Sequence, residues 1–136
     1  MTSDSNSPRS AIESAKRTIA IERKAVEQLE DRIDDSFSKA VDLLASVDGR
    51  VIVSGMGKSG HIGNKIAATL ASTGTPAQFV HPAEACHGDM GMVTRSDAAL
   101  LMSNSGTTSE ITALLPLLKR LLSLIHISEP TRPRLI

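Results

Sequence analysis

The stretch SGMGKSGHIGNK, residues Ser54–Lys65, directly follows the apolar run Val51–Val53. A short run of β-branched residues without polar alternation predicts a strand that is buried on both faces, here over Arg50–Ser54. Beyond the glycines, the spacing of apolar residues predicts a helix over His61–Ser72. The quoted stretch is therefore expected to be a glycine-rich loop that joins a buried strand to a helix, as in a parallel βαβ unit.

The rest of the chain repeats this alternation of strands and helices. Apolar runs predict strands over Ala77–Val80 and Ala98–Met102, separated by a long loop over His81–Val93. A second polar loop, SNSGTTS at Ser103–Ser109, leads into another helix. Parallel strands bring such loops to one edge of the sheet, where ligands of α/β folds bind. The sequence thus predicts an α/β fold in which three loops converge on one site.

The N-terminal third has a different pattern. From Ser10 to Leu44, apolar residues recur mostly three or four positions apart with charged residues between them, which predicts one face of a helix. About 35 residues exceed the usual length of a globular helix, so we expect a break near Asp34–Ser36 or a helix that projects to contact another subunit. Two helices covering one core are the simpler interpretation. Residues 1–9, which are polar and include Pro8, are predicted to be a disordered lead-in.

Composition argues against several classes of partner. Fifteen basic and fifteen acidic residues balance, so no net field attracts nucleic acid or an anionic membrane. The chain has no Trp or Tyr and only two Phe, which removes the aromatic platforms on which bases stack. No apolar run approaches the roughly 20 residues of a membrane span. The single cysteine, Cys86, excludes an internal disulfide and fits a reducing compartment, so we expect a soluble cytoplasmic protein without nucleic-acid or membrane partners.

Several interpretations compete for the glycines at Gly55–Gly60. The letters match the dinucleotide fingerprint G-x-G-x-x-G, but His81-Pro82 stands where an acidic residue is expected after the second strand. A nucleotide P-loop is rejected, because Ile52 stands where that motif needs a glycine. A smaller phosphate cradle, built from backbone N–H groups and Ser59 at a helix N-terminus, is the third interpretation. Glycines required only for the geometry of a tight turn are the alternative without a ligand.

The second polar loop favours a ligand that carries a phosphate, because two hydroxyl-rich loops then share one sheet edge. Three motifs, GMGKSGHIGNK from Gly55, HPAEACHGDMG from His81 and SNSGTTSEI from Ser103, together resemble the sugar isomerase domain family, specifically its arabinose 5-phosphate isomerases. The resemblance covers roughly Ser10 to Arg120 and rests on the three motifs standing in the family's order.

The resemblance implies a flavodoxin-like parallel sheet between helices, truncated here after about three strands and preceded by N-terminal helices. It divides the chain into the lead-in, a partial sugar isomerase domain at 10–120 and a tail at 121–136. The tail, LLSLIHISEPTRPRLI, has no counterpart in the family and resembles translated sequencing adapter. We therefore expect part of a longer enzyme that assembles as a homo-oligomer, a dimer or a tetramer.

Interconversion of an aldose and a ketose phosphate moves a proton between adjacent carbons, stabilises an enediol oxygen and first opens the sugar ring. The resemblance places the proton carrier at Glu110, in the first turn of a helix, although helix N-termini also favour acidic residues through the dipole. Lys58 is expected to stabilise the enediolate or to pair with phosphate, and simple solvation is its alternative. His87, in ACHGD, resembles the family's active-site histidine and would exchange protons during ring opening. His61 and His81 are assigned packing or capping, with ligand contact the lesser alternative for His81.

Phosphate contacts are expected from hydroxyls and backbone N–H groups of both loops, at Gly57, Ser59, Ser103, Ser105, Gly106 and Thr108. Thr107 stands where the relatives carry an acidic residue. We expect no metal, because Cys86, His87 and Asp89 lack the spacing of a structural site, and no cofactor. A noncatalytic sugar-phosphate sensor and a nicotinamide-dependent reductase are the two alternative functions.

Overall fold

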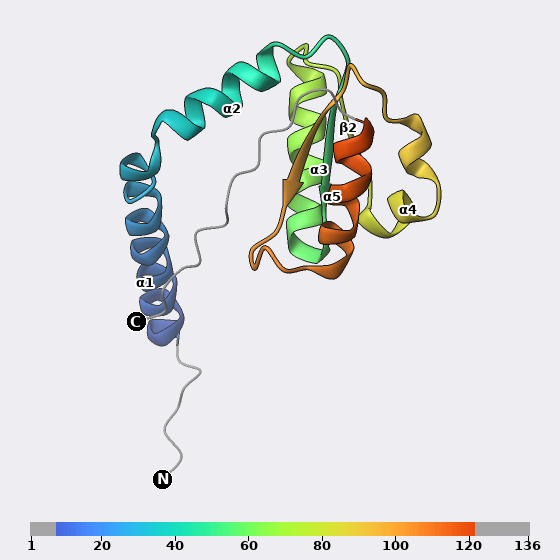
Figure 1. Cartoon of the computed structure of the whole chain (residues 1–136). Helices are drawn as coiled ribbons and strands as arrows, with labels where there is room; N and C mark the ends of the chain where they lie inside the picture. The colour runs from blue at the N-terminus through green and yellow to red at the C-terminus, as the bar shows by residue number, and fades with distance from the viewer. Residues whose placement is uncertain (1–7, 122–136) are drawn as a thin grey trace. The chain divides into compact units, whose positions relative to one another are not determined.

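The computed structural model describes residues 8–121 (Figure 1). Residues 1–7 of the expected lead-in and residues 122–136 of the expected tail lie outside the described residues. The chain divides into two compact units, residues 1–38 and residues 39–136. The second unit contains the sheet and both polar loops.

The described chain begins with helices, and the second of them crosses the boundary between the two units. α1 spans Pro8–Glu27, so it begins inside the expected lead-in, and a 3-10 turn, η1, spans Glu30–Arg32. A new helix, α2, spans Asp35–Ala45. At its start, Oδ1 of Asp34 accepts the backbone N–H of Ser36 at 2.9 Å, as an N-cap residue does. The break that the length of the pattern predicted is confirmed.

The apolar face of α1 is exposed. Ile12, Ile19 and Val26 expose 58%, 63% and 66% of their surface. α1 lies in the first unit and the core of the sheet in the second, so the expectation that both N-terminal helices cover one core stays a prediction for α1. In α2, Leu44 packs against a cluster that includes Val53. Hydrophobic periodicity predicts that a segment is helical, but it does not specify which surface the apolar face will meet.

The second unit contains a parallel sheet of three strands. β1 spans Val51–Gly55, β2 spans Ala77–Phe79 and β3 spans Ala98–Met102, in the order β2-β1-β3. β1 is central and buried along its whole length, as its β-branched run predicted. The register pairs Val53 with Leu100 of β3. All three predicted strands are confirmed, with ends that differ by one residue at most.

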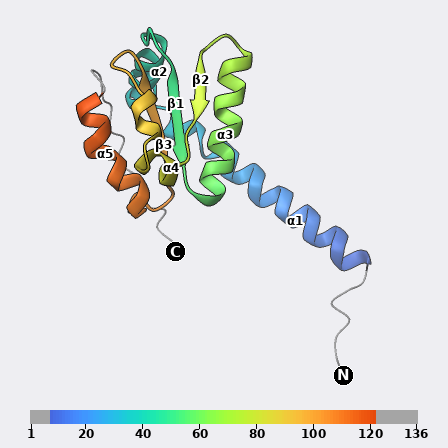
Figure 2. The ribbon, with the colours of Figure 1, turned by 90° about the vertical axis from the view of Figure 1, so that its right-hand side faces the viewer.

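Helices cover both faces of the sheet. α3, at Gly57–Ser72, packs on the face that Val53 shares. α4, at Pro82–Cys86, and α5, at Ser109–Leu121, pack on the face that Ile52 shares. Successive side chains of a strand point to opposite faces, so β1 contributes to both layers. Figure 2 shows α3 and α5 on either side of the sheet.

Two segments are more helical than the sequence predicted. α3 begins at Gly57, four residues before its expected start, so Lys58 and Ser59 lie in its first turn. The low helix propensity of glycine concealed that turn. The expected loop over His81–Val93 contains α4 and a second 3-10 turn, η2, at Asp89–Met92.

A buried carboxylate holds the amino ends of β1 and β3 together. Asp97 accepts the backbone N–H of Arg50 at 2.7 Å and that of Thr94 at 2.8 Å, and the Arg50 guanidinium donates to the carbonyl oxygen of Met92 at 2.7 Å. Burial raises the pKa of Asp97, but the hydrogen bonds from Thr94 and Arg50 outweigh it and hold the pKa below its ordinary value. These hydrogen bonds hold the amino ends of β1 and β3 together, and the polar loops follow the opposite, carboxyl ends of the same two strands.

Candidate functional site at the carboxyl edge of the sheet

Two polar segments follow the neighbouring strands β1 and β3, where the chain turns toward opposite faces of the sheet. We call residues 54–65 the glycine segment and residues 103–109 the hydroxyl segment. β1 and β3 are neighbours, yet β1 is followed by α3 on one face and β3 by α5 on the other (Figure 2). Open α/β sheets bind their ligands at such a topological switch point, outside the carboxyl ends of the strands.

The glycines of the glycine segment allow α3 to pack closely against the sheet. A Cβ atom at Gly60 would lie 2.5 Å from the carbonyl oxygen of Gly55, and one at Gly63 would lie 3.2 Å from the ring of Phe79. Gly57 has a φ of 53°, in the left-handed region, with open space around its Cβ position. Backbone geometry and packing therefore explain these glycines, and their pattern alone indicates no ligand.

The first turn of α3 presents polar groups at the same edge. Lys58 is exposed and Ser59 is half-buried. The N-cap residue, Met56, accepts no hydrogen bond through its side chain from the backbone N–H groups of this turn. The first backbone N–H groups of a helix have no partner within it, and they suit a phosphate. This turn, rather than the glycine pattern, is what can bind an anion.

The hydroxyl segment is held by its own side chains. Ser103 Oγ lies 3.0 Å from Thr108 Oγ1 and accepts the backbone N–H of Gly106 at 3.0 Å. Ser105 Oγ accepts the backbone N–H of Thr107 at 3.2 Å. Three of the expected phosphate contacts, Ser103, Gly106 and Thr108, are therefore brought together, whereas Ser105 pairs separately. A phosphate bound here would replace these internal bonds with bonds to its own oxygens.

Glu110 lies in the first turn of α5, next to the hydroxyl segment. The Ser109 hydroxyl donates to Oε2 of Glu110 at 2.7 Å. This hydrogen bond contributes most to lowering the pKa of Glu110, followed by the Glu110 backbone N–H, and the charge of His81 lowers it further against the opposing effect of desolvation. Glu110 is thus held ionised, the form in which a carboxylate accepts a proton.

His81 has one role that the sequence predicted and one that it did not. It is the N-cap of α4, where its Nδ1 accepts the backbone N–H of Ala83 at 3.3 Å, so the expected capping role is confirmed. Pro82, at the first position of the helix, was the sequence signal for α4. The action of the His81 charge on Glu110 was not predicted, because α4 and α5 meet only in the folded chain.

His87 and Lys58 are the other two residues with a predicted catalytic role. His87 is the exposed C-cap of α4, and its backbone N–H donates to the carbonyl oxygen of Glu84 at 2.9 Å. Within residues 8–121, no hydrogen bond or ion pair joins the side chain of Lys58 or His87 to Glu110. The catalytic roles of both residues stay predictions.

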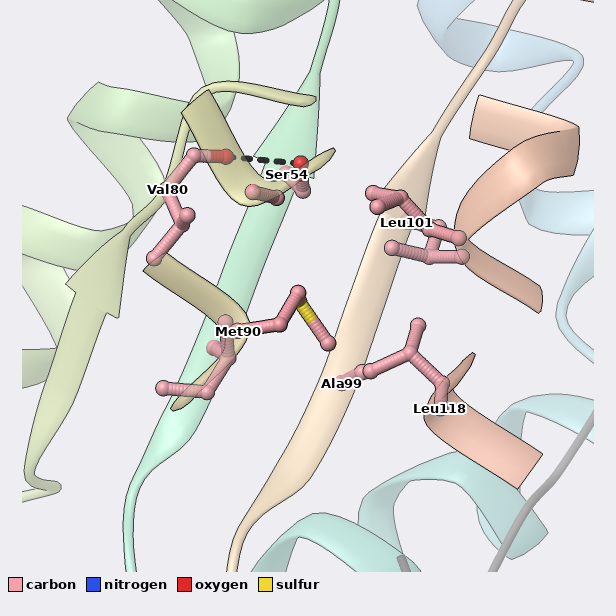
Figure 3. A pocket seen from close by; sticks show the side chains of 9 residues that line it. Ser54, Val80, Met90, Ala99, Leu101 and Leu118 are labelled. Carbon is pink, nitrogen blue, oxygen red and sulfur yellow. Dashed lines mark hydrogen bonds between the residues drawn. The ribbon is translucent and has the colours of Figure 1, made fainter. Parts of the chain in front are cut away.

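An apolar pocket lies on the α4–α5 side of the sheet (Figure 3). It is lined by Ile52, Ser54, Val80, Ala85, Met90, Ala99, Leu101, Leu114 and Leu118. The Ser54 hydroxyl, the polar group of this lining, donates to the carbonyl oxygen of Val80 at 2.7 Å. Sugar phosphates require several polar partners, so this pocket belongs to the hydrophobic core and not to the candidate site.

Three further features of residues 8–121 concern metals, membranes and thiols. Residues 8–121 contain no group of three His, Cys, Asp or Glu side chains arranged to hold a metal ion. None of the helices in that range has the length and apolar character to cross a membrane. Cys86 is exposed and carries a free thiol.

The chain is similar in sequence to a known domain family and to several known proteins. The family model for the SIS domain matches residues 43–126. The arabinose 5-phosphate isomerase KdsD of Pseudomonas aeruginosa is 66% identical over 110 residues, which cover 81% of this chain and 34% of that protein. KdsD of Escherichia coli strain K12 is 55% identical over 109 residues, which cover 80% and 33%. The chain thus spans about a third of the length of the curated relatives it matches.

A solved structure resembles the backbone as well. The c3406 protein of Escherichia coli CFT073, in complex with arabinose 5-phosphate, is 46% identical and aligns with a TM-score of 0.80. The alignment covers 85% of this chain and 63% of that one. The likeness therefore extends from the three sequence motifs to the parallel sheet and its helices, and the predicted fold class is confirmed.

Proposed function

The chain belongs to the SIS domain family, and we propose that it supplies one part of the active site of an isomerase that interconverts arabinose 5-phosphate and ribulose 5-phosphate. The observation that carries the proposal is an ionised carboxylate, Glu110, at a switch point that also carries the exposed Lys58 and the hydroxyl segment. Relatives named for arabinose 5-phosphate isomerisation match four fifths of this chain, which supports the same substrate.

In the proposed reaction, Glu110 accepts the proton from C2 of the open-chain aldose while O1 gains a proton, which gives an enediol. Delivery of the proton to C1 and loss of the proton on O2 then complete the ketose. Lys58 stabilises the negative charge that develops on the enediol oxygen. His87 moves the proton that opens the sugar ring. Each step needs only proton transfer, so the proposal includes no metal and no cofactor.

The phosphate is proposed to bind between the two segments. The uncapped first turn of α3 supplies backbone N–H groups near Gly57 and the hydroxyl of Ser59. The hydroxyl segment adds Ser103, Ser105, Gly106 and Thr108. We further propose that the full enzyme is a cytoplasmic homo-oligomer that provides sugar precursors for lipopolysaccharide or capsule.

A chimera tests the proposal. The matched segment of this chain replaces its counterpart in the Pseudomonas aeruginosa relative, which supplies the remaining two thirds of the protein. We expect the chimera to convert arabinose 5-phosphate, and Glu110→Gln to lower kcat about a thousandfold while leaving substrate affinity in place. Glu84→Gln, at an exposed carboxylate of α4, is the matched control and should leave kcat unchanged.

Three other results would redirect the proposal. Turnover that survives Glu110→Gln removes Glu110 from the mechanism. An inactive chimera that still binds arabinose 5-phosphate favours the noncatalytic sensor. Thermal stabilisation of the chain by NADH, and not by arabinose 5-phosphate, favours the reductase.

A further inference from the structure

β1 anchors the start of the segment that carries His87. We call residues 81–93, which contain α4 and η2, the histidine segment. Just before it, the backbone N–H of Val80 donates to the carbonyl oxygen of Val53 at 2.9 Å, and the carbonyl oxygen of Val80 accepts the Ser54 hydroxyl at 2.7 Å (Figure 3). Ser54 is only 2% exposed, so water does not compete for this bond. The histidine segment therefore leaves the sheet from a point that β1 determines.

Arg50, directly before β1, anchors the other end of the histidine segment. Its guanidinium donates to the carbonyl oxygen of Met92 at 2.7 Å and lies 3.4 Å from the Asp97 carboxylate. Asp97 also accepts the backbone N–H of Thr94 at 2.8 Å, so the chain that follows the segment is held by the same carboxylate. Hydrogen bonds from a charged donor are stronger than those between neutral groups. Arg50 and Ser54 thus hold the two ends through bonds to backbone carbonyl oxygens.

Between these two anchors, the histidine segment packs against β1 through apolar side chains. Ile52, the residue of β1 that lies between the anchors and shares their face, belongs to one hydrophobic cluster with Ala85 of α4 and Met90 of η2. Residues 86–89 are exposed, and they include His87. An exposed residue has few contacts of its own, so the position of His87 follows from the contacts of the residues on either side.

Packing alone does not explain Ser54. Its side chain lines the apolar pocket together with Ile52 and Leu118, and a hydroxyl buried among apolar groups costs free energy unless it is hydrogen-bonded. The bond to Val80 offsets that cost. It also has a direction, which apolar contacts lack. Ser54 therefore orients the start of the histidine segment rather than adding to the core.

We propose that Arg50 and Ser54 are positioning residues that hold both ends of the histidine segment and thereby place His87 for proton transfer to the sugar. The inference rests on the proposed function, because it takes a sugar phosphate as the ligand of His87. Neither anchor contacts the substrate in this role, since each bonds to the backbone and acts through the path of the chain. Proton transfer requires the donor and the acceptor to lie within hydrogen-bond reach, so a displaced His87 lowers the rate of ring opening.

Substitutions at each anchor test this role by NMR in the 136-residue chain. Ser54→Ala and Arg50→Met remove the two donors, and Arg50→Lys keeps a charged donor as the conservative variant. Amide exchange of Ala85 reports the start of the histidine segment and that of Val93 its end, because both amides donate to carbonyl oxygens within it. We expect about tenfold faster exchange of Ala85 in Ser54→Ala and of Val93 in Arg50→Met. The ring signal of His87 should shift in both variants, and all changes should be smaller in Arg50→Lys.

The chimera gives the catalytic readout. Ser54→Ala and Arg50→Met should lower its kcat about tenfold and leave KM within about twofold, because a displaced His87 transfers protons poorly while the phosphate contacts stay intact. Arg50→Lys should restore most of kcat. Leu118→Val is the matched control, because Leu118 lines the same pocket as Ser54 from α5 but anchors neither end of the histidine segment. It should reduce stability and leave kcat unchanged.

Two results would overturn the inference while the proposed function stands. Unchanged amide exchange and an unchanged His87 signal in both anchor variants would mean that these side chains do not hold the histidine segment. A kcat that falls as far in Leu118→Val would mean that a general loss of packing explains the effect. A failure of the proposed function looks different, because the unsubstituted chimera would then not convert arabinose 5-phosphate. The anchors would in that case lose their catalytic role, whatever the exchange rates are.

Discussion

The glycine segment and the hydroxyl segment end neighbouring strands at the same edge of the sheet, and in sequence they look alike. In the structure they are held by different forces. The glycine segment is held by close packing, since Gly60 and Gly63 leave room for backbone and ring atoms that a Cβ would meet. The hydroxyl segment is held by hydrogen bonds among Ser103, Gly106 and Thr108.

The contrast shows that small residues at one edge of the sheet have two different roles, close packing and hydrogen bonding. Gly60 and Gly63 bring α3 against β1 and Phe79, and this packing places the first turn of α3 at the edge of the sheet. Hydroxyls that bond to one another are available for exchange, because a phosphate oxygen can replace a hydroxyl as acceptor. Substitutions in the glycine segment should therefore change stability, whereas those in the hydroxyl segment should change ligand binding more than stability.

The largest effect is expected for Gly60→Ala. The new Cβ would lie 2.5 Å from the carbonyl oxygen of Gly55, a backbone atom that cannot move without displacing β1. Overpacking of this kind costs roughly 3 kcal/mol, more than the gain in helix propensity from alanine. We expect the melting temperature to fall by about 10 °C or more. Thermal unfolding followed by circular dichroism measures the change.

Asn64→Ala is the matched control for Gly60→Ala, because Asn64 is an exposed position of the same helix. It should leave the melting temperature unchanged or raise it, since alanine favours helices. A melting temperature for Gly60→Ala equal to that of the control would show that packing does not hold the glycine segment.

A smaller loss is expected for Gly63→Ala. Its Cβ would lie 3.2 Å from the Phe79 ring and 3.3 Å from Cγ1 of Val53. Side chains can shift more easily than backbone, so we expect a loss of roughly 1–2 kcal/mol. The double variant with Phe79→Leu should lose less than the sum of the two single variants, because a smaller side chain relieves the contact. Additive losses would mean that Gly63 does not pack on Phe79.

The elements of the sheet were predictable because their signals are local. The β-branched run at Val51–Val53 predicted β1, and similar apolar runs predicted β2 and β3. The first turn of α3 was missed, since Gly57 and Gly60 are poor helix formers that here serve packing. The surface that the apolar face of α1 meets was not predictable, because an apolar stripe does not specify its partner.

The candidate site was predictable only where its residues belong to motifs. Glu110 and the hydroxyl segment were named from residue type, position and resemblance, and Ser103 does lie beside Thr108. The relation between His81 and Glu110 was not predictable, because it depends on the packing of α4 against α5. The sequence did signal the cap itself, through Pro82 at the first position of α4.

In the hydroxyl segment, Ser103→Ala should have a modest effect on stability and a larger one on binding. The change removes the acceptor of the Gly106 N–H and the partner of Thr108 Oγ1. We expect about 1 kcal/mol of lost stability and clearly weaker binding of arabinose 5-phosphate. Thr107→Ala, at an exposed hydroxyl, is the control. Equal binding by both variants would contradict the role given to the segment.

The smallest effect is expected for Ser109→Ala, which should alter the ionisation of Glu110 and leave the melting temperature unchanged. The Ser109 hydroxyl donates to Oε2 of Glu110 at 2.7 Å and thereby favours the charged carboxylate. Loss of this donor raises the pKa of Glu110 toward its ordinary value of 4.5, so the carboxylate protonates at a higher pH. Carboxyl ¹³C shifts followed through a pH titration report that change directly.

Ser109→Ala also tests whether a hydroxyl of the hydroxyl segment sets the charge state of Glu110. If the Glu110 titration is unchanged in Ser109→Ala, the hydroxyl next to the carboxylate does not set its charge state. If the pKa rises and His81→Ser raises it again in the double variant, two elements act on one carboxylate independently. In the chimera, the acid limb of the kcat/KM profile should move to higher pH with Ser109→Ala, because Glu110 must be ionised to accept the proton.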